Sequence, residues 1–293
     1  MSKITVIGSI NMDLVTTAEK FPGKGETILG QSFSTIPGGK GANQAVAASK
    51  LGADVTFIGC VGDDPFAKTL MDHFNRHGIN TNFIKKIEGE PTGVASITIA
   101  EDDNNIIVVS GANQAVSPEM VEQHEDVIAA SETIILQFEI PMETIEKVIE
   151  VASKHGVTII LNPAPVRPIS LEALERVDYI TPNEHELAIL LDDQEKKAFY
   201  ESHREKFIVT QGAEGVAYYD GEEHLVPGYS VEVVDTTGAG DSFNGALAVA
   251  LTKGESLEES CRFGNAVGAL AVSKLGAQTG MPTLEEVKQF LNK

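Results

Sequence analysis

The sequence predicts an α/β fold, a Rossmann-like three-layer sandwich in which helices cover both faces of a mainly parallel central sheet. Short β-branched runs alternate with segments of helical periodicity through most of the chain, which is typical of βαβ units. The alternation stops in two places, where strand-like runs follow one another directly, and there we expect a small antiparallel sheet. The chain of 293 residues, 42% of them apolar, is long and apolar enough to bury a large core.

The predicted elements of the α/β body follow in chain order. We expect strands at residues 4–8, 55–61, 133–137, 157–161, 177–181 and 207–210. We expect helices at residues 41–51, 65–77 and 142–155, from 184 onward, and roughly at 239–252, 257–273 and 284–291. Gly52 and Gly78 follow the first two helices directly, and glycine is a common helix stop.

Two insertions, at about residues 12–36 and 93–110, interrupt this alternation. Residues 94–99 alternate between apolar and polar side chains, as a half-exposed strand does, and the polar residues 102–105 form a turn to the next strand. No linker rich in proline or serine separates these insertions, so we expect one domain over 1–293, with the insertions as a small flap beside the α/β body. A sheet with one exposed face tends to cover a site or a partner.

Charge and cysteine content exclude several classes of protein. Lysine and arginine number 22 and aspartate and glutamate 43, a net charge of −21, so nucleic acid and anionic membrane are not expected partners. Two cysteines cannot form a disulfide framework, and their spacing does not indicate structural zinc. The first residues are too polar for a signal peptide, and no apolar run approaches the ~18 residues of a membrane span. We therefore expect a soluble, cytoplasmic protein.

Residues 234–245 are the strongest candidate for chemistry. Gly238, Ala239 and Gly240 precede an alanine-rich helix, where backbone amides and the helix N-terminus can form an anion hole. Asp241 follows them directly and could accept a proton from an incoming hydroxyl during phosphoryl transfer. Alternatively, Asp241 only caps the helix.

Two glycine-containing segments are candidates for binding a hydroxylated ligand. Residues 37–44 offer three glycines, the Lys40 ammonium and amide side chains, although they do not form a Walker motif, because Ser34 and Gly41 stand where that motif needs glycine and serine or threonine. A flexible loop is the alternative. Asn11 and Asp13 follow the first strand and could bind hydroxyls in a fork, or they could simply form a turn.

Asn183 and Glu186 follow a predicted strand and would share one face of the next helix. They could orient Mg²⁺ through water, although acidic residues are common at a helix N-terminus in any case. His73 and His77 have a spacing that suits zinc, but no glutamate follows His73 and His77 stands at a helix end, so we do not expect metal there.

Taken together, these motifs resemble the ribokinase branch of the PfkB carbohydrate kinase family. The resemblance covers nearly the whole chain and rests on segments in the family's order, namely residues 8–13, 38–44, 59–64, 162–165, 183–186, 235–245 and 276–278. It implies a ribokinase-like fold and ATP-dependent phosphorylation of D-ribose at its 5-hydroxyl. It also implies that Asp241 is the general base and that Gly238, Ala239 and Gly240 form the anion hole.

The resemblance implies further site residues. The positions that match sugar binding are Asn11, Asp13, Gly39, Lys40, Gly41, Asn43, Glu139 and Asp241. Those that match binding of ATP are Asn183, Glu186, Thr210, Gln211, Gly212, Ala213, Glu214, Gly215, Gly240 and Asn265, with Glu186 helping to hold Mg²⁺. Those that match a K⁺ site, mostly through carbonyls, are Asp235, Thr237, Ala271, Lys274 and Gly276. The resemblance also implies that the flap formed by the two insertions is the family's lid, and that pairing of lids between subunits makes a homodimer.

The chain departs from the family in two places, and other activities remain open. Gly280 stands where some relatives offer a serine to the cation, and the segment between Glu186 and Phe207 is short. A deoxyribokinase, fructokinase or nucleoside kinase is the main alternative. A dinucleotide-dependent oxidoreductase is disfavoured because GxGxxG is missing after the first strand, and a silent sugar sensor would not need Asp241 as a base.

Overall fold

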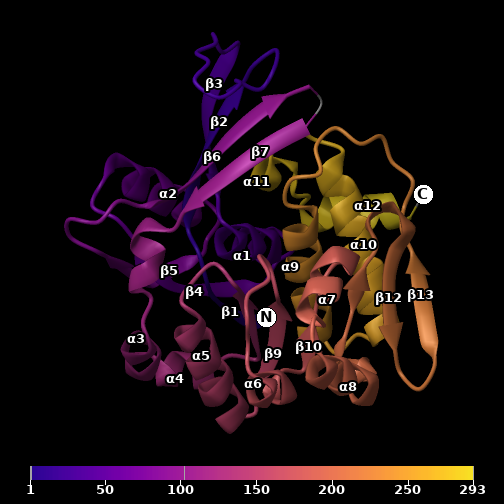
Figure 1. Ribbon diagram of the computed structural model, residues 1–293. Coiled ribbons are helices and arrows are strands. Elements are labelled where there is room, and N and C mark those ends of the chain that lie inside the picture. Colours follow the sequence, from indigo (N-terminus) through magenta and orange to yellow (C-terminus); the bar gives the residue numbers. More distant parts are fainter. Residues whose placement is uncertain (1, 102, 293) are drawn as a thin grey trace.

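The computed structural model describes residues 2–101 and 103–292, and a six-stranded parallel sheet lies at its centre (Figure 1). The strand order is β10–β9–β8–β1–β4–β5, and every pair is parallel. The strands are β1 (Lys3–Ile7), β4 (Asp54–Val61), β5 (Asn80–Lys86), β8 (Thr133–Gln137), β9 (Thr158–Asn162) and β10 (Tyr179–Ile180).

The side chains of each central strand alternate between two hydrophobic cores, one on either face of the sheet. Ile4 and Val6 of β1 pack in the first core, and Ile7 packs in the second. In β8, Ile135 belongs to the first core and its neighbours to the second. Because successive strand residues point to opposite faces, continuous apolar runs bury both faces. The predicted three-layer sandwich is confirmed.

Helices form the two outer layers. Those that contribute to the first core are α1 (Lys40–Lys50), α2 (Pro65–Arg76), α9 (Ala239–Thr252), α10 (Leu257–Val272) and α12 (Leu284–Leu291). Those that contribute to the second are α3 (Pro118–Gln123), α4 (Glu125–Ala129), α5 (Met142–Lys154), α6 (Leu171–Arg176), α7 (Glu184–Leu190) and α8 (Gln194–Ser202). The short helix α11 (Ala277–Gly280) and three 3₁₀ turns, at Gly111–Ala115, Arg204–Lys206 and Gly212–Glu214, complete the helices of the described residues.

A four-stranded sheet stands above one end of the body (Figure 1), with the order β3–β2–β6–β7. Its strands are β2 (Asn11–Thr17), β3 (Ser32–Gly38), β6 (Gly93–Ala100) and β7 (Asp103–Val109). The outer pairs are antiparallel, as predicted, but the central pair β2–β6 is parallel. The chain passes through the body between these two strands, so no tight turn dictates their direction. Strand β7 begins at Asp103, inside the predicted turn, and Asp102 of that turn lies outside the described residues.

A three-stranded antiparallel sheet continues the central sheet at its β10 edge and differs from the sequence prediction. It contains β11 (Val209–Thr210), β12 (Gly215–Tyr219) and β13 (Glu223–Pro227). Parallel bridges from Ile180 to Phe207 and from Asn183 to Thr210 join the two sheets. We did not predict the β12–β13 hairpin, although the Asp220-Gly221 pair at its turn is a known hairpin signal. The predicted strands 177–181 and 207–210 are shorter than expected.

Within the described part of the chain, no helix is long and apolar enough to cross a membrane.

Close packing of α1 against α9 holds together the two helices that carry the candidate site. A side-chain carbon at Gly245 of α9 would lie 2.7 Å from Ala47 Cβ and 2.8 Å from the Gln44 carbonyl oxygen of α1. Neither atom can withdraw without moving a helix. Glycine at this position therefore sets the distance between the helices.

We predict that Gly245→Ala lowers the free energy of unfolding by about 1–3 kcal/mol, because overpacking costs more than the gain in helix propensity. Gly268→Ala on α10 is the matched control. Its added carbon would meet nothing closer than 3.7 Å, so it should stabilise by about 0.5–1 kcal/mol. Urea unfolding measures both variants, and a Gly245→Ala variant as stable as the wild type would contradict the packing argument.

Candidate active site

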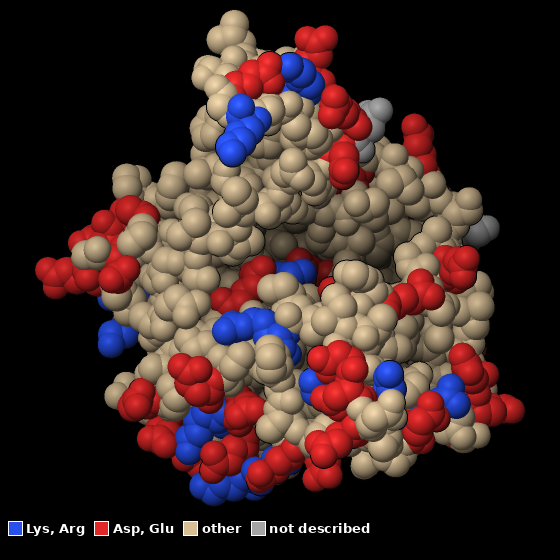
Figure 2. Space-filling model, viewed as in Figure 1, with Lys and Arg blue, Asp and Glu red and all other residues tan. Residues whose placement is uncertain are grey.

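The candidate site lies where the central strands end and the four-stranded sheet meets the body. Figure 2 shows a hollow at this place, with acidic and basic side chains inside it. Ser9 follows β1, Glu139 follows β8, and Asn162 is the last residue of β9. The carboxyl ends of parallel strands meet at one edge of the sheet, which is where open α/β sheets bind ligands.

A pocket of about 210 Å³ brings many of the predicted residues together. It joins the N-termini of α1, α7 and α9 with the ends of β9 and β11. The residues that line it are Lys40, Asn162, Thr181, Asn183, Glu186, Thr210, Thr236, Gly238, Ala239, Gly240, Asp241 and Asn244. Two segments about 200 residues apart in the sequence, around Lys40 and Asp241, therefore face each other.

The Asp241 carboxylate is held between α9 and α1. It lies in the first turn of α9 and is only 7% exposed. Asn43 Nδ2 donates to Oδ2 (2.8 Å), and Gln44 Nε2 donates to Oδ1 (2.9 Å). The N-cap of α9 is Gly238, which makes no side-chain capping bond. Asp241 therefore does not cap the helix, and its two oxygens accept hydrogen bonds from α1.

The loop before α9 lines the pocket with the backbone of Gly238, Ala239 and Gly240, and the Ala239 amide donates to the Thr236 carbonyl oxygen at 3.3 Å. Gly238 has φ of 77°, in the left-handed region that favours glycine, and a side-chain carbon there would lie 2.8 Å from Ala277 Cβ. A side-chain carbon at Gly240 would face open space. With the partial positive charge of the α9 N-terminus, this stretch fits an anion.

Lys40 is the cation that lines the pocket, at the start of α1. Burial alone would lower the pKa of its ammonium. The carboxylates of Asp241, Glu139 and Glu186 outweigh this effect, so the pKa of Lys40 is raised and the side chain stays charged.

A second group of predicted residues surrounds the junction between β1 and β2. Glu139 Oε2 accepts from Ser9 Oγ (2.5 Å) and from the Lys40 amide (3.0 Å), and Ser9 Oγ accepts from the Gly41 amide (3.2 Å). Asn11 Oδ1 accepts from Asn113 Nδ2 (2.7 Å). These bonds fix polar side chains at one mouth of the site.

The Asp13 carboxyl lies over Gly38 of the neighbouring strand. A side-chain carbon at Gly38 would come within 2.3 Å of Asp13 Oδ2, so only glycine fits there without a shift. Burial, followed by the charges on Glu139 and Asp241, raises the pKa of Asp13 to about 7. Three carboxyl groups therefore lie near one another on this side of Lys40.

The residues predicted for ATP and Mg²⁺ are only partly brought together. Asn183 and Glu186 line the pocket and form a capping box at the start of α7, with bonds of 2.8 and 2.9 Å. Glu186 Oε2 accepts one of these bonds, and the second carboxylate oxygen, Oε1, can face a ligand. Thr210 also lines the pocket, and Gln211, Gly212, Ala213, Glu214 and Gly215 form the turn beyond it. Asn265 does not line this pocket, and its amide donates to the Val226 and Pro227 carbonyls of β13.

The residues predicted for K⁺ lie together beside the α9 loop. Asp235 accepts from the Thr237 amide (2.9 Å) and the Gly276 amide (2.8 Å). Burial would raise the pKa of Asp235, but these bonds outweigh it and lower the pKa. A side-chain carbon at Gly280 would lie 2.5 Å from the Ala271 carbonyl oxygen and 3.4 Å from that of Lys274. Two carbonyls of the predicted set thus converge on the space that Gly280 leaves free.

Sequence reasoning assigned no role to several buried amide side chains around Asp241. Gln44 Oε1 accepts from Gln137 Nε2 (2.6 Å), and Gln44 Nε2 also contacts Asn162 Oδ1 (3.2 Å). Asn43 Oδ1 accepts from Gln278 Nε2 (2.8 Å). Gln44, Asn162 and Gln278 all lie in segments that we singled out. The available signal was their position, because Gln137 and Asn162 end the strands β8 and β9.

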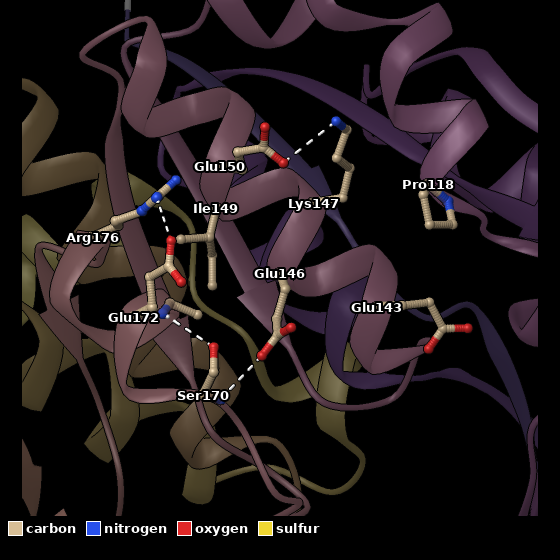
Figure 3. A pocket seen from close by; sticks show the side chains of 10 residues that line it. Pro118, Glu143, Glu146, Lys147, Ile149, Glu150, Ser170, Glu172 and Arg176 are labelled. Carbon is tan, nitrogen blue, oxygen red and sulfur yellow. Dashed lines mark hydrogen bonds and ion pairs between the residues drawn. The ribbon is translucent and has the colours of Figure 1, made fainter.

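A larger hollow of about 490 Å³ lies elsewhere, among α3, α5 and α6 (Figure 3). Four of its charged side chains form two pairs, Glu172–Arg176 at 2.7 Å and Lys147–Glu150 at 3.4 Å. Glu146 accepts from the Ser170 amide (3.0 Å). These groups are already satisfied, so this hollow is a poor candidate for a reaction centre.

Comparison with known proteins shows the family. Residues 1–284 match the pfkB family of carbohydrate kinases. The chain belongs to this family. It is 45% identical to a ribokinase from Bacillus subtilis over 296 aligned residues, which cover all of both proteins.

Solved structures agree with this assignment. The chain superposes on a ribokinase from Thermotoga maritima with a TM-score of 0.91 and 36% identity, and all of both chains are covered. It superposes on an Arabidopsis thaliana ribokinase complexed with ribose and ATP with a TM-score of 0.92 and 33% identity, again over the whole of both chains. The predicted fold and family are confirmed.

The raised pKa of Asp13 leads to a prediction about stability. An aspartate in the unfolded chain titrates near 3.9, whereas Asp13 in the folded PfkB protein titrates at about 7. Between these values the native state binds the extra proton, so stability falls as pH rises through this window.

We therefore predict that Asp13→Asn stabilises the ligand-free protein more at pH 8 than at pH 5. The two gains should differ by at least about 1 kcal/mol, close to the equivalent of one pKa unit. Urea unfolding of the wild type and the variant at both pH values measures this difference. Equal gains at both would show that Asp13 titrates in its ordinary range.

Proposed function

We propose that this protein is a ribokinase, which transfers the γ-phosphoryl group of ATP to the 5-hydroxyl of D-ribose. The observation that carries the proposal is the buried Asp241 carboxylate beside the amides at the start of α9, in one pocket with Lys40. The identity to ribokinases over the whole chain supports ribose as the sugar. A deoxyribokinase, fructokinase or nucleoside kinase would use the same pocket and is the alternative.

In the proposed mechanism, Asp241 accepts the proton of the sugar hydroxyl. The hydroxyl oxygen forms a bond to the γ-phosphorus while the bond from that phosphorus to the bridging oxygen breaks, and ADP leaves. The amides of Gly238, Ala239 and Gly240, together with Lys40, stabilise charge on the moving phosphoryl group. These groups are fixed before the reaction by the packing of α9 on α1.

We place the sugar between Asp241 and the junction of the two sheets. Asn11, Asp13, Gly39, Gly41, Asn43 and Glu139 would contact its hydroxyls, since this mouth of the site combines carboxylates, amides and bare backbone. We place ATP along α7 and the turn after β11. Asn183 and Glu186 would hold Mg²⁺ through water, and Mg²⁺ would neutralise phosphate charge in a chain of net charge −21.

We also propose that K⁺ binds beside the α9 loop, to Asp235, Thr237, Ala271, Lys274 and Gly276. The convergence of the Ala271 and Lys274 carbonyls on Gly280 supports a hard cation there. Such a cation would fix the loop that carries Gly238–Asp241.

We predict that Asp241→Asn lowers kcat by roughly 10²- to 10⁴-fold, the contribution of a general base, while ribose still binds. The amide is nearly isosteric with the carboxylate but cannot take up the proton. Turnover assays and isothermal titration with ribose measure the two effects. The control is Asp220→Asn, at an exposed residue that pairs with His224 (2.6 Å), and a variant at position 241 with near-normal turnover would exclude this mechanism.

The substrate and the cation are tested by ATP consumption with Mg²⁺ across D-ribose, 2-deoxyribose, fructose and adenosine, each with K⁺ or with Na⁺ alone. We predict turnover of ribose, stimulated by K⁺. Preference for another sugar would assign the chain to a sister activity within the family. Indifference to K⁺ would contradict the proposed cation site.

We further propose that the chain is one domain whose four-stranded sheet is a lid, and that two lids pair in a homodimer. Apolar side chains project from this sheet along β7 and β3, and Ile107 and Phe33 are 68% and 65% exposed. A second copy would bury this surface. Sedimentation should give a dimer, and Ile107→Asp should give a monomer. A wild-type monomer would contradict the pairing.

A further inference from the structure

A line of hydrogen bonds leads from Asp241 to His73 of α2. Asn43 Nδ2 donates to Asp241 Oδ2 (2.8 Å), and Gln278 Nε2 donates to Asn43 Oδ1 (2.8 Å). His73 Nε2 then lies 2.7 Å from Gln278 Oε1. The line runs through α9, α1, α11 and α2, whose residues are far apart in the sequence. Asp241, Asn43 and Gln278 are all buried, so water does not compete for these bonds.

The direction of every bond in this line follows from the carboxylate at its end. Asn43 presents its NH₂ group to the carboxylate and its carbonyl to Gln278. Gln278 must then present its own NH₂ group to Asn43 and its carbonyl to His73. The carbonyl of Gln278 needs a donor, and so His73 Nε2 must carry a proton.

The surroundings of His73 fit this tautomer. Its Nδ1 lies 3.4 Å from Arg76 Nη2, which can only donate. Burial, and to a lesser degree the charges of Arg76 and Lys50, lower the pKa of His73 despite its bond to Gln278, so the ring is neutral near pH 7. The His77 ring meets it edge-on, with ring centroids 4.6 Å apart. A neutral ring with the proton on Nε2 satisfies both of its nitrogens.

The second oxygen of Asp241 has no comparable line to the surface. Gln44, which donates to Oδ1, is held by Gln137, and Gln137 Oε1 has no hydrogen-bond partner in the described structure. The orientation of Gln44 is therefore fixed entirely within the core. Of these two lines, only the one through Asn43 ends on a titratable side chain that is partly exposed, that of His73.

We propose that His73 is a positioning residue for Asp241: its Nε2 proton satisfies the carbonyl of Gln278 and so holds the amides of Gln278 and Asn43 in the orientation in which an NH₂ group faces the carboxylate. The proposal rests on the proposed function, in which Asp241 is the base and Asn43 contacts the sugar. Without the donor at position 73, the buried carbonyl of Gln278 loses its partner, so Gln278 no longer holds Asn43 firmly. The hydrogen bond from Asn43 to Asp241 would then position the carboxylate less well.

The first test is the tautomer of His73, which does not depend on activity. ¹⁵N NMR of histidine-labelled protein, with His73→Gln to assign the signal, should show a neutral ring protonated on Nε2 above neutral pH. In Gln278→Met, the Nε2 signal should shift because its acceptor is gone. The proposal is overturned if the His73 ring is protonated on Nδ1, or if its Nε2 signal is unchanged in Gln278→Met.

The second test is kinetic. His73→Phe should lower kcat about fivefold, the effect of one hydrogen bond of about 1 kcal/mol, with KM for ATP within about twofold. His73→Gln, whose amide can still donate to Gln278, should restore most of the loss. His77→Phe, at the C-cap of the same helix and outside the line, is the matched control.

Each kinetic outcome decides the proposal. An unchanged kcat in His73→Phe, equal losses in His73→Phe and His73→Gln, or an equal loss in His77→Phe overturns it. If His73→Phe does not fold, the tautomer of the wild type decides. If no sugar is phosphorylated by the wild type, the proposed function fails, whereas the NMR result still shows whether His73 orients the amides.

Discussion

The burial of one carboxylate between two helices is the constraint on which the rest of the site depends. Asp241 lies in the first turn of α9, and α1 supplies a donor to each of its oxygens. A buried charge without such donors would cost several kcal/mol. The helices must therefore approach closely and in one register, and Gly245 makes that approach possible. The apolar packing of α1, α9 and α10 stabilises the fold and also positions the Asp241 carboxylate.

The electrostatics of the site follow from the acidic composition of the chain. Asp241, Glu139 and Glu186 gather around Lys40, whose ammonium they keep charged. The positive potential that a phosphate needs must come from this ammonium, from the α9 amides and from bound cations, because the chain has a net charge of −21. Burial, reinforced by the charges on Glu139 and Asp241, explains why the pKa of Asp13 is raised.

The central parallel sheet and the four-stranded sheet join at the point where the sugar is proposed to bind. The loop from β1 to β2 crosses from the body into the four-stranded sheet, and Asn113 holds this loop through hydrogen bonds to Ile10 and Asn11. Gly93 of β6 leaves room for this contact, since a side-chain carbon there would lie 2.1 Å from Asn11 Oδ1. Buried hydrogen bonds thus fix the four-stranded sheet where it meets the body.

The layers of the fold and the chemical groups of the site follow from the sequence alone, because periodicity and glycine placement are local properties. Alternating runs predict the parallel sheet, and the glycines and polar side chains around Lys40 and Asp241 mark both segments as candidates. The packing of distant elements determines that Gln44, Gln137 and Gln278 surround Asp241, that β2 pairs parallel with β6, and that Asn265 contacts β13. Periodicity shows which face of an element is buried, but not against which other element that face packs. Hydrogen bonds between residues distant in the sequence depend on this packing.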